Sequence, residues 1–335
     1  MSKVSLLGAG SWGTALAILL ANNGHDVTLW SALKDEVEML SVHREHKDRL
    51  PGCILPDNIT ISADLEASCK DKDLIVFSVA SPYVRQTAKN ASPFIAKGQM
   101  IVNVAKGIEN ETLYTISQIL EEEIPEGRIA VLSGPSHAEE VSKGIPTTVV
   151  IGCKCKETAV TAQDIFMNDV FRVYTSPDVI GIELGGSLKN VIALAAGIVD
   201  GLGYGDNTKA ALMTRGIAEM SRLGIKMGGK IETSSGLSGV GDLIVTCTSK
   251  HSRNRNAGYL IGKGYTMKEA MDEVKQVVEG VYSAKAALCL AKKYEVSMPI
   301  VEQINKVLFE NKSAKEALND LLMRERVTEY PTLEW

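Results

Sequence analysis

The chain has little of the positive charge, long apolar sequence or paired cysteine that marks nucleic-acid-binding, transmembrane or disulfide-stabilised proteins. Its 36 lysines and arginines are outnumbered by 41 aspartates and glutamates, and the resulting charge of -5 gives no general attraction to nucleic acid or anionic lipid. We therefore expect no nucleic-acid partner, and any anion-binding site must be a local one.

Apolar runs are too short to predict a membrane span. The most hydrophobic stretch contains a wholly apolar run of nine residues, Val191–Val199, whereas a spanning helix needs about 20. Glycines and Trp12 interrupt the apolar N-terminal run and no small-residue cleavage site follows it, so no secretory signal is predicted. We expect a soluble, cytoplasmic chain.

Cysteine is scarce and poorly placed for cross-links or metals. The chain has 6 cysteines, and a chain of this length can build its core without disulfides. Only Cys153 and Cys155 lie close together, and a lone C-x-C without a second pair or nearby histidines is a poor zinc site. We predict free thiols and no metal site.

In the first half of the chain, apolar strand-like runs alternate with helical segments, among them residues 82–91 and 111–123. Continuous apolar runs are typical of strands buried on both faces of a parallel sheet. The strand-like runs are KVSLL, DVTLW, DLIVFSVA, MIVNVA, RIAVLSG and TTVVIG. The alternation predicts an N-terminal α/β domain with a Rossmann-like doubly wound sheet.

From Val179 the chain shows helical periodicity almost to its end, as in TMKEAMDEVKQVVEG and SAKEALNDLLMRE. We therefore expect an all-α C-terminal domain. The predicted division is a dinucleotide-binding domain over residues 1–180 and a helical substrate domain over residues 181–335. At roughly 100–200 residues per domain, two domains also suit a chain of 335 residues.

The segment GAGSWG follows the first strand and opens a helix that is predicted to end near Gly24. Its spacing is Gly8-x-Gly10-x-x-Gly13. Gly8 permits the tight turn, Gly10 lets a pyrophosphate approach the backbone, and Gly13 lets helix and strand pack closely. The helix N-terminus adds free N–H groups and a positive partial charge. This context predicts a dinucleotide-binding site.

The end of the second strand leaves the cofactor preference open. An NAD site normally has a carboxylate there to hold the ribose 2′-hydroxyl, but this sequence has Ser31 and Ala32. Asp35 and Glu36 come later and are typical of the first turn of the next helix. The Ser31 hydroxyl could reach a ribose or a 2′-phosphate, and Lys34 is near, so NAD and NADP both fit.

A lysine lies inside an otherwise small and apolar helix. In GIELGGSLKNVIALAAG, desolvation would lower the pKa of the Lys189 amine toward neutrality, which suits a proton donor to a carbonyl oxygen. A lysine whose stem packs while its head reaches solvent explains the pattern equally well. The other residues on the same helical face are Ile182, Gly186, Ala193, Ala196 and Asp200.

Polar groups also follow two of the other predicted strands. Lys106 comes directly after MIVNVA, and Gly134, Pro135 and Ser136 follow RIAVLS. The carboxyl ends of parallel strands are where α/β sheets bind ligands. The second segment could equally be a plain proline-containing loop in which Ser136 or His137 caps the next helix, and we assign His137 no chemistry.

The segment CTSKHSRNRNAGYLIGKG predicts an anion site. Arg253 and Arg255 lie at a helix start with Ser252 as its expected cap, and guanidinium groups and helix N-termini both bind phosphate oxygens. A solvated basic loop is the alternative. Upstream, Asp242 lies among glycines and apolar residues, where an unpaired carboxylate is costly, so Lys189 is its predicted partner.

Seven motifs together resemble one enzyme family. They are GAGSWGTALA, AKGIE, SGPSHAEEV, GGSLKNVIALAAGIVDGLGYGDNTKAALMTRG, GVGDLIVTCTS, SRNRNAG and QVVEG, and they span essentially the whole chain. On these motifs the chain resembles the soluble bacterial NAD(P)-dependent sn-glycerol-3-phosphate dehydrogenases. The resemblance implies interconversion of dihydroxyacetone phosphate and sn-glycerol 3-phosphate by hydride transfer at C2, which feeds phospholipid synthesis. Family members often carry Arg or His where this sequence has Ser31 and Ala32.

The resemblance implies that Lys189 is the proton donor and acceptor at C2. The implied catalytic residues are Lys189, Asn190 and Asp242. The implied substrate-binding residues are Lys106, Gly134, Ser136, Lys189, Asp242, Ser252, Arg253 and Asn254. The residues expected at the NAD or NADP cofactor, from the sequence and the resemblance together, are Gly8, Gly10, Ser11, Trp12, Gly13, Ser31, Lys106, Ala138, Arg253, Val277 and Glu279.

Two rival functions stay open at this stage. A related two-domain dehydrogenase acting on a 3-hydroxy acid would bind a carboxylate instead of a phosphate. A non-catalytic dinucleotide-sensing protein would need the three glycines but would leave Lys189, Asp242 and Arg253 without a role. The prediction with most support is a phosphorylated triose on which Lys189 and Arg253 converge. A homodimer is compatible with the sequence, which does not fix the oligomeric state.

Overall fold

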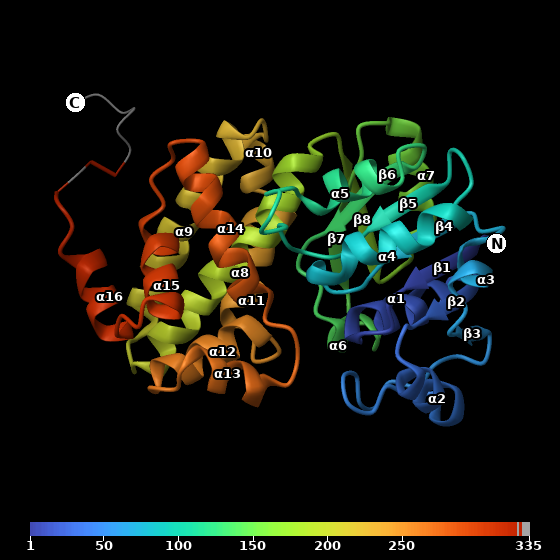
Figure 1. The fold of residues 1–335 in the computed structure, drawn as a ribbon, viewed down its shortest axis with the longest axis horizontal. Helices are drawn as coiled ribbons and strands as arrows, with labels where there is room; N and C mark the ends of the chain where they lie inside the picture. Colours follow the sequence, from blue (N-terminus) through green and yellow to red (C-terminus); the bar gives the residue numbers. More distant parts are fainter. Residues whose placement is uncertain (327, 330–335) are drawn as a thin grey trace.

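The computed structural model describes residues 1–326, 328 and 329 and has a strand-rich half and an all-helical half (Figure 1). The strand-rich half contains one sheet in the order β3-β2-β1-β4-β5-β6-β7-β8. The strands are β1 (Lys3–Leu7), β2 (Asp26–Trp30), β3 (Ile59–Ser62), β4 (Leu74–Phe77), β5 (Met100–Asn103), β6 (Arg128–Ser133), β7 (Thr147–Gly152) and β8 (Phe171–Ser176). Neighbouring strands are parallel except β6 and β7. The predicted α/β class is confirmed, with the last two strands reversed in direction.

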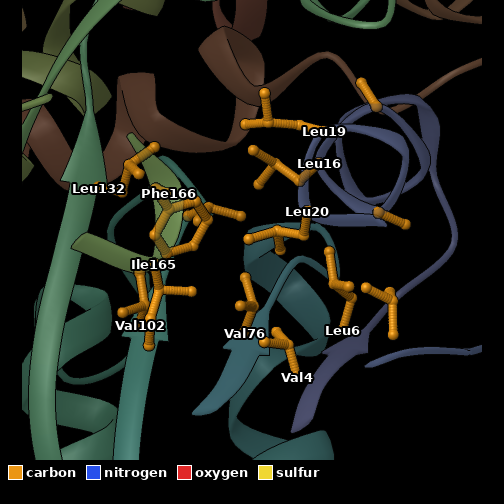
Figure 2. Close-up of a cluster of buried hydrophobic side chains, with 14 of the residues drawn as sticks. Val4, Leu6, Leu16, Leu19, Leu20, Val76, Val102, Leu132, Ile165 and Phe166 are labelled. Atoms are coloured by element: carbon orange, nitrogen blue, oxygen red, sulfur yellow. The ribbon is translucent and has the colours of Figure 1, made fainter. Parts of the chain in front are cut away.

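Helices cover both faces of this sheet. Val4 and Leu6 of β1 face Leu16 and Leu20 of the first helix, whereas the next side chain, Leu7, packs on the opposite face (Figure 2). Burial on both faces explains why the strands read as continuous apolar runs. The helices of this half are α1 (Ser11–Asn22), α2 (Lys34–His43), α3 (Leu65–Cys69), α4 (Val84–Ala91), α5 (Ile116–Glu123), α6 (Ala138–Val141) and α7 (Lys156–Phe166), with 3₁₀ turns η1 (Ser81–Tyr83) and η2 (Ser92–Phe94).

Three features of this half differ from the prediction. The strands β3 and β8 were not predicted, because they form the two edges of the sheet and carry partly exposed side chains instead of continuous apolar runs. The helix predicted over residues 111–123 begins later, at Ile116. Leu113 adopts a left-handed φ of 62°, and Thr115 forms a capping box with Gln118 that fixes the helix start.

The all-helical half follows directly after β8, because β8 ends at Ser176 and α8 begins at Val179. The segment TMKEAMDEVKQVVEG is one helix and the start of another: Lys275 has a left-handed φ of 55° and separates them. The elements are α8 (Val179–Gly201), α9 (Asp206–Lys226), α10 (Ile231–Ser234), a π-helical turn η3 (Leu237–Gly241), α11 (Asp242–Thr248), α12 (Arg253–Gly262), α13 (Met267–Val274), α14 (Glu279–Lys293), α15 (Pro299–Phe309) and α16 (Ala314–Leu322). The predicted all-α architecture is confirmed.

The central helix α8 is longer and more apolar than the nine-residue run suggested. It has 23 residues and a window of mean hydropathy 1.4, which is enough in length and composition to cross a membrane. In the structure 89% of that window is buried, by α9, α11, α12 and α14 among others. Its apolar surface is therefore accounted for by packing inside the fold.

Glycines bring α12 into backbone contact with α8. A Cβ atom added to Gly197 of α8 would lie 2.0 Å from the Arg255 carbonyl oxygen, and one added to Gly258 of α12 would lie 2.0 Å from the Leu194 carbonyl oxygen. Only hydrogen atoms fit between the two backbones at these points. The relative position of α8 and α12 is therefore set by main-chain contact, not by adaptable side chains.

Candidate active site

The glycine-rich turn has the geometry that a dinucleotide pyrophosphate requires. Gly8 has a φ of +123°, and a Cβ atom there would lie 2.6 Å from the Val79 nitrogen. A Cβ atom on Gly13 would lie 2.0 Å from the Gly8 carbonyl oxygen. A Cβ atom on Gly10, in contrast, would have its nearest neighbour, Arg49 Nη1, 3.7 Å away. The turn is packed tightly from behind and open at Gly10, where α1 presents its uncapped N–H groups.

At the end of β2, the Ser31 hydroxyl is already hydrogen-bonded to a carboxylate of the protein. Ser31 is buried and donates its hydroxyl to the Glu36 carboxylate, which also accepts a hydrogen bond from His46 Nε2 at 2.9 Å and forms an ion pair with Arg49 Nη1 at 3.1 Å. Glu36 does lie in the first turn of α2, but its side chain points back to the strand. Burial would raise the pKa of Glu36; hydrogen bonds from His46 and Ser31 and the charge of Arg49 outweigh it and lower that pKa. No motif in the sequence predicts this cluster.

A buried carboxylate joins two lysines from different halves of the chain. Lys189 Nζ on α8 lies 2.9 Å from Asp242 Oδ1, and Lys106 Nζ, just after β5, lies 2.6 Å from Asp242 Oδ2. The predicted pairing of Lys189 with Asp242 is present, and the alternative of a lysine head in solvent is wrong, because the Lys189 side chain is only 8% exposed. Two ammonium groups on one carboxylate leave a local excess of positive charge.

Thr246 completes the surroundings of the amine. Lys189 Nζ donates to Thr246 Oγ1 at 2.6 Å, and that hydroxyl donates to the Asp242 carbonyl oxygen at 2.6 Å. Thr246 is one helical turn after Asp242, so a single helix, α11, orients both partners of the amine. The sequence analysis missed Thr246, although its spacing of four residues from Asp242 would have placed it on the same helical face.

Burial and charge set the proton affinity of this cluster. Burial lowers the pKa of Lys189 to about 8; Asp242 opposes this shift and Lys106 adds to it. Burial would raise the pKa of Asp242, but the two ammonium groups outweigh it, so that the pKa is lowered and the carboxylate stays ionised. An amine with a pKa near neutrality can give or take a proton under physiological conditions.

Lys106 also contacts the loop after β6. Its Nζ donates to the Gly134 carbonyl oxygen at 3.1 Å, and the Ser136 hydroxyl donates to the same oxygen at 2.9 Å. Ala138 begins α6 and is buried. His137 is the N-cap residue of α6, as the alternative of a plain loop expects, but its side chain makes no capping hydrogen bond. These residues lie at the carboxyl ends of β5 and β6, next to Asp242.

An asparagine pair links α8 to α12 beside the two predicted cations. Asn254 Nδ2 donates to Asn190 Oδ1 at 2.9 Å, and the Gly280 nitrogen donates to Asn254 Oδ1 at 2.8 Å. Asn190 follows Lys189 in the chain and Asn254 follows Arg253, so the pair joins the helices at the neighbours of both cations. Figure 1 shows α12 lying alongside α8.

The arginines of the predicted anion site separate. Ser252 caps α12 through the Arg255 nitrogen, as predicted. Arg255 Nη2 lies 2.6 Å from Asp200, which also binds Lys209, so Arg255 is already paired. Arg253 is exposed and forms no ion pair within the described residues. It is the arginine of this segment that remains available to an anion.

Glu279 connects the helical half to the loop that follows β4. It accepts the Ser81 nitrogen at 3.1 Å and the Ser81 hydroxyl. Ser81 is two residues after Val79, which packs against Gly8 of the glycine turn. Burial raises the pKa of Glu279, opposed by Ser81. Glu279 is thus brought close to the glycine turn from the far end of the sequence, and Val277 lies two residues before it in the chain.

These features define a class of protein: a two-domain dehydrogenase in which a Rossmann-type sheet binds the dinucleotide and a helical unit supplies a buried lysine. Family models described as the N-terminus and C-terminus of NAD-dependent glycerol-3-phosphate dehydrogenase match residues 3–159 and 178–319. The chain belongs to this family. In residues 1–326, 328 and 329 no group of histidine, cysteine, aspartate and glutamate side chains is arranged to hold a metal ion.

Individual relatives agree with this assignment. The chain is 63% identical over 335 residues to glycerol-3-phosphate dehydrogenase [NAD(P)+] of Agathobacter rectalis, covering 100% of both chains. It is 57% identical over 331 residues to the protein of the same description from Fusobacterium nucleatum, covering 98% of this chain and 99% of that one. A crystal structure of glycerol-3-phosphate dehydrogenase from Coxiella burnetii matches with a TM-score of 0.94 and 37% identity, covering 96% of this chain and 99% of that chain.

Proposed function

We propose that the chain interconverts dihydroxyacetone phosphate and sn-glycerol 3-phosphate with NAD or NADP. The observation that carries this proposal is the buried Lys189 amine, held by Asp242 and Thr246 beside the carboxyl end of the sheet. A dinucleotide-sensing protein has no use for such an amine. A 3-hydroxy acid dehydrogenase would bind a carboxylate with its second cation, and the description of the relatives as glycerol-3-phosphate dehydrogenases favours a phosphate instead.

The chain's own groups perform the proton transfer. The nicotinamide cofactor, when bound, supplies or accepts the hydride. In reduction the Lys189 ammonium donates a proton to the oxygen on C2, and in oxidation the neutral amine removes it. Asp242 compensates the ammonium in a buried position, and Thr246 fixes its direction by accepting one of its hydrogen bonds.

Phosphate binding is proposed at the start of α12. Arg253 supplies a guanidinium group, and Ser252 and Asn254 lie on either side of it at the helix N-terminus. Lys106 and the Gly134–Ser136 segment would close the other side of the substrate. In this arrangement the amine of Lys189 acts at C2 and the guanidinium of Arg253 holds the phosphate, so both act on one triose.

The pH dependence of the rate should follow the Lys189 pKa of about 8. Reduction needs the ammonium, so its kcat should fall as pH rises through about 8. Oxidation needs the neutral amine, so its kcat should rise over the same range. Initial rates measured in both directions at saturating substrate test this. Parallel pH profiles in the two directions would contradict the assigned proton transfer.

Substitution of Arg253 by alanine should raise the KM for dihydroxyacetone phosphate by roughly 10- to 100-fold, since charge-assisted hydrogen bonds contribute about 1.5–3 kcal/mol. Steady-state kinetics at saturating NADH measure this. Lys250→Ala removes an equal charge from an exposed residue of the same segment and serves as the control. An unchanged KM in Arg253→Ala would place the phosphate elsewhere.

Oxidation of NADH and NADPH, followed separately by absorbance with dihydroxyacetone phosphate, tests the function itself. We expect turnover with dihydroxyacetone phosphate and no oxidation of 3-hydroxy acids when the reaction is run in the reverse direction. Binding of dinucleotide without turnover on either substrate would favour the sensing protein.

We also propose that the product supplies phospholipid synthesis in the cytoplasm, and that residues 1–180 bind the dinucleotide while residues 181–335 bind the substrate. A homodimer is the oligomeric state to test first, by light scattering.

A further inference from the structure

Arg49 lies over the open side of the glycine turn, in the segment between α2 and β3. Its Nη1 atom is 3.7 Å from the position that a Cβ atom on Gly10 would take, and among the described residues no other neighbour lies within 4 Å of that position. Gly10 is the glycine at which a dinucleotide pyrophosphate approaches the backbone. A guanidinium group is thus placed next to the open face of the turn.

A buried carboxylate holds this guanidinium in place. Glu36 is 7% exposed; its oxygens accept hydrogen bonds from Ser31 and His46, and Oε1 forms an ion pair with Arg49 Nη1. Arg49 itself is 38% exposed and makes no other ion pair within residues 1–326, 328 and 329. A guanidinium group has five N–H donors in a fixed plane. The ion pair with Glu36 therefore anchors Arg49 at Nη1, and the N–H donors on its other nitrogens are available to an anion.

The charge of a second arginine, Arg253 at the start of α12, interacts with that of Arg49. Burial lowers the pKa of the Arg253 guanidinium, Glu279 and Glu139 oppose this lowering, and the charge of Arg49 adds a smaller contribution to it. Two guanidinium groups that repel each other are stabilised when an anion lies between them. The phosphates of a bound dinucleotide would provide that anion.

We propose that Arg49 is a cofactor-binding residue that contacts a phosphate of the dinucleotide, and that Glu36 is the positioning residue that holds it. This inference deepens the proposed function and rests on it for the identity of the ligand. The contacted phosphate is the pyrophosphate, which NAD and NADP share, or the 2′-phosphate, which only NADP has. Arg49 lies beside Gly10 and pairs with Glu36, which also accepts the Ser31 hydroxyl at the end of β2, so both phosphate positions are candidates.

Titration calorimetry with NAD and with NADP, in the absence of any triose, tests the inference. Arg49→Ala should weaken dinucleotide binding by roughly 10- to 100-fold, the range for a charge-assisted hydrogen bond. Equal losses for both dinucleotides would identify the pyrophosphate, and a loss confined to NADP would identify the 2′-phosphate. Unchanged affinity for both would overturn the proposal. Because no triose is present, the result does not depend on whether the chain reduces dihydroxyacetone phosphate.

Two controls separate binding from folding. Lys47→Ala removes the same charge from an exposed residue two positions away and should bind both dinucleotides normally. Arg49→Lys keeps the charge and should recover part of the affinity. Glu36→Gln should raise the KM for the dinucleotide and leave kcat at saturating dinucleotide unchanged. A lower melting temperature of Glu36→Gln with an unchanged KM would show that Glu36 is only structural and would overturn its positioning role.

Discussion

Lys189→Ala should lower turnover by roughly 10²–10⁴-fold, the usual contribution of general acid–base catalysis, and leave dinucleotide affinity nearly unchanged. The amine is the only proton-donating group that the proposal places at C2, whereas the dinucleotide is held by the glycine turn on a different part of the chain. Absorbance assays with NADH give kcat, and calorimetry gives the affinity. Both should be measured on the same preparation.

The controls for this variant concern the space that the side chain fills. Alanine leaves a cavity on α8, so Lys189→Met, which restores most of the buried volume without the amine, is the matched variant. Lys189→Met should be as inactive as Lys189→Ala, but its melting temperature should be closer to that of the unchanged chain. Activity within tenfold of the unchanged chain in either variant would contradict the catalytic role of the amine.

Asp242→Asn should have the second largest effect, because it removes the one carboxylate in the described part of the chain that pairs with both the Lys106 and the Lys189 ammonium groups. Removing one partner of a buried ion pair typically costs about 3–5 kcal/mol. The pKa of Lys189 should then fall below about 8, since Asp242 is the group that raises it. The kcat for reduction should therefore begin to fall at a lower pH in this variant than in the unchanged chain. A pH–rate profile of the variant shows the shift directly.

Asp200→Asn is the matched control for this prediction. Asp200 also joins two cations, with Lys209 and Arg255 each at 2.6 Å, but it belongs to the far end of α8. Its loss should lower the melting temperature without moving the pH limit of the reaction. If Asp242→Asn also leaves the pH limit in place, the carboxylate does not govern the proton affinity of Lys189.

The sequence predicted the parts of the site that depend on local chemistry. The Gly8, Gly10 and Gly13 spacing is local, and its turn has the expected close contacts. The pairing of Lys189 with Asp242 was predictable because two buried charges of opposite sign each need a partner. The two-part architecture was predictable because strands buried on both faces and amphipathic helices have different periodicities.

The remaining contacts depend on tertiary structure that no local pattern encodes. Whether the Lys189 head was buried or solvated could not be decided from its helical face, because the answer lies in the packing of α11 against α8. The contact of Lys106 with Asp242 joins residues 136 positions apart. Arg49 was overlooked because it lies in an irregular segment with no motif, and only the fold brings it to the glycine turn.

The main-chain contact between α8 and α12 limits which substrates fit. Lys189 and Arg253 belong to these two helices, and neither helix can slide or tilt toward the other without a collision at Gly197 or Gly258. The span between the reacting carbon and the phosphate is therefore fixed by the backbone. A phosphorylated ketone with one more carbon would have to be accommodated by a different Arg253 rotamer alone. On the proposed roles of Lys189 and Arg253, Gly197 and Gly258 would set the length of substrate that fits between the two cations.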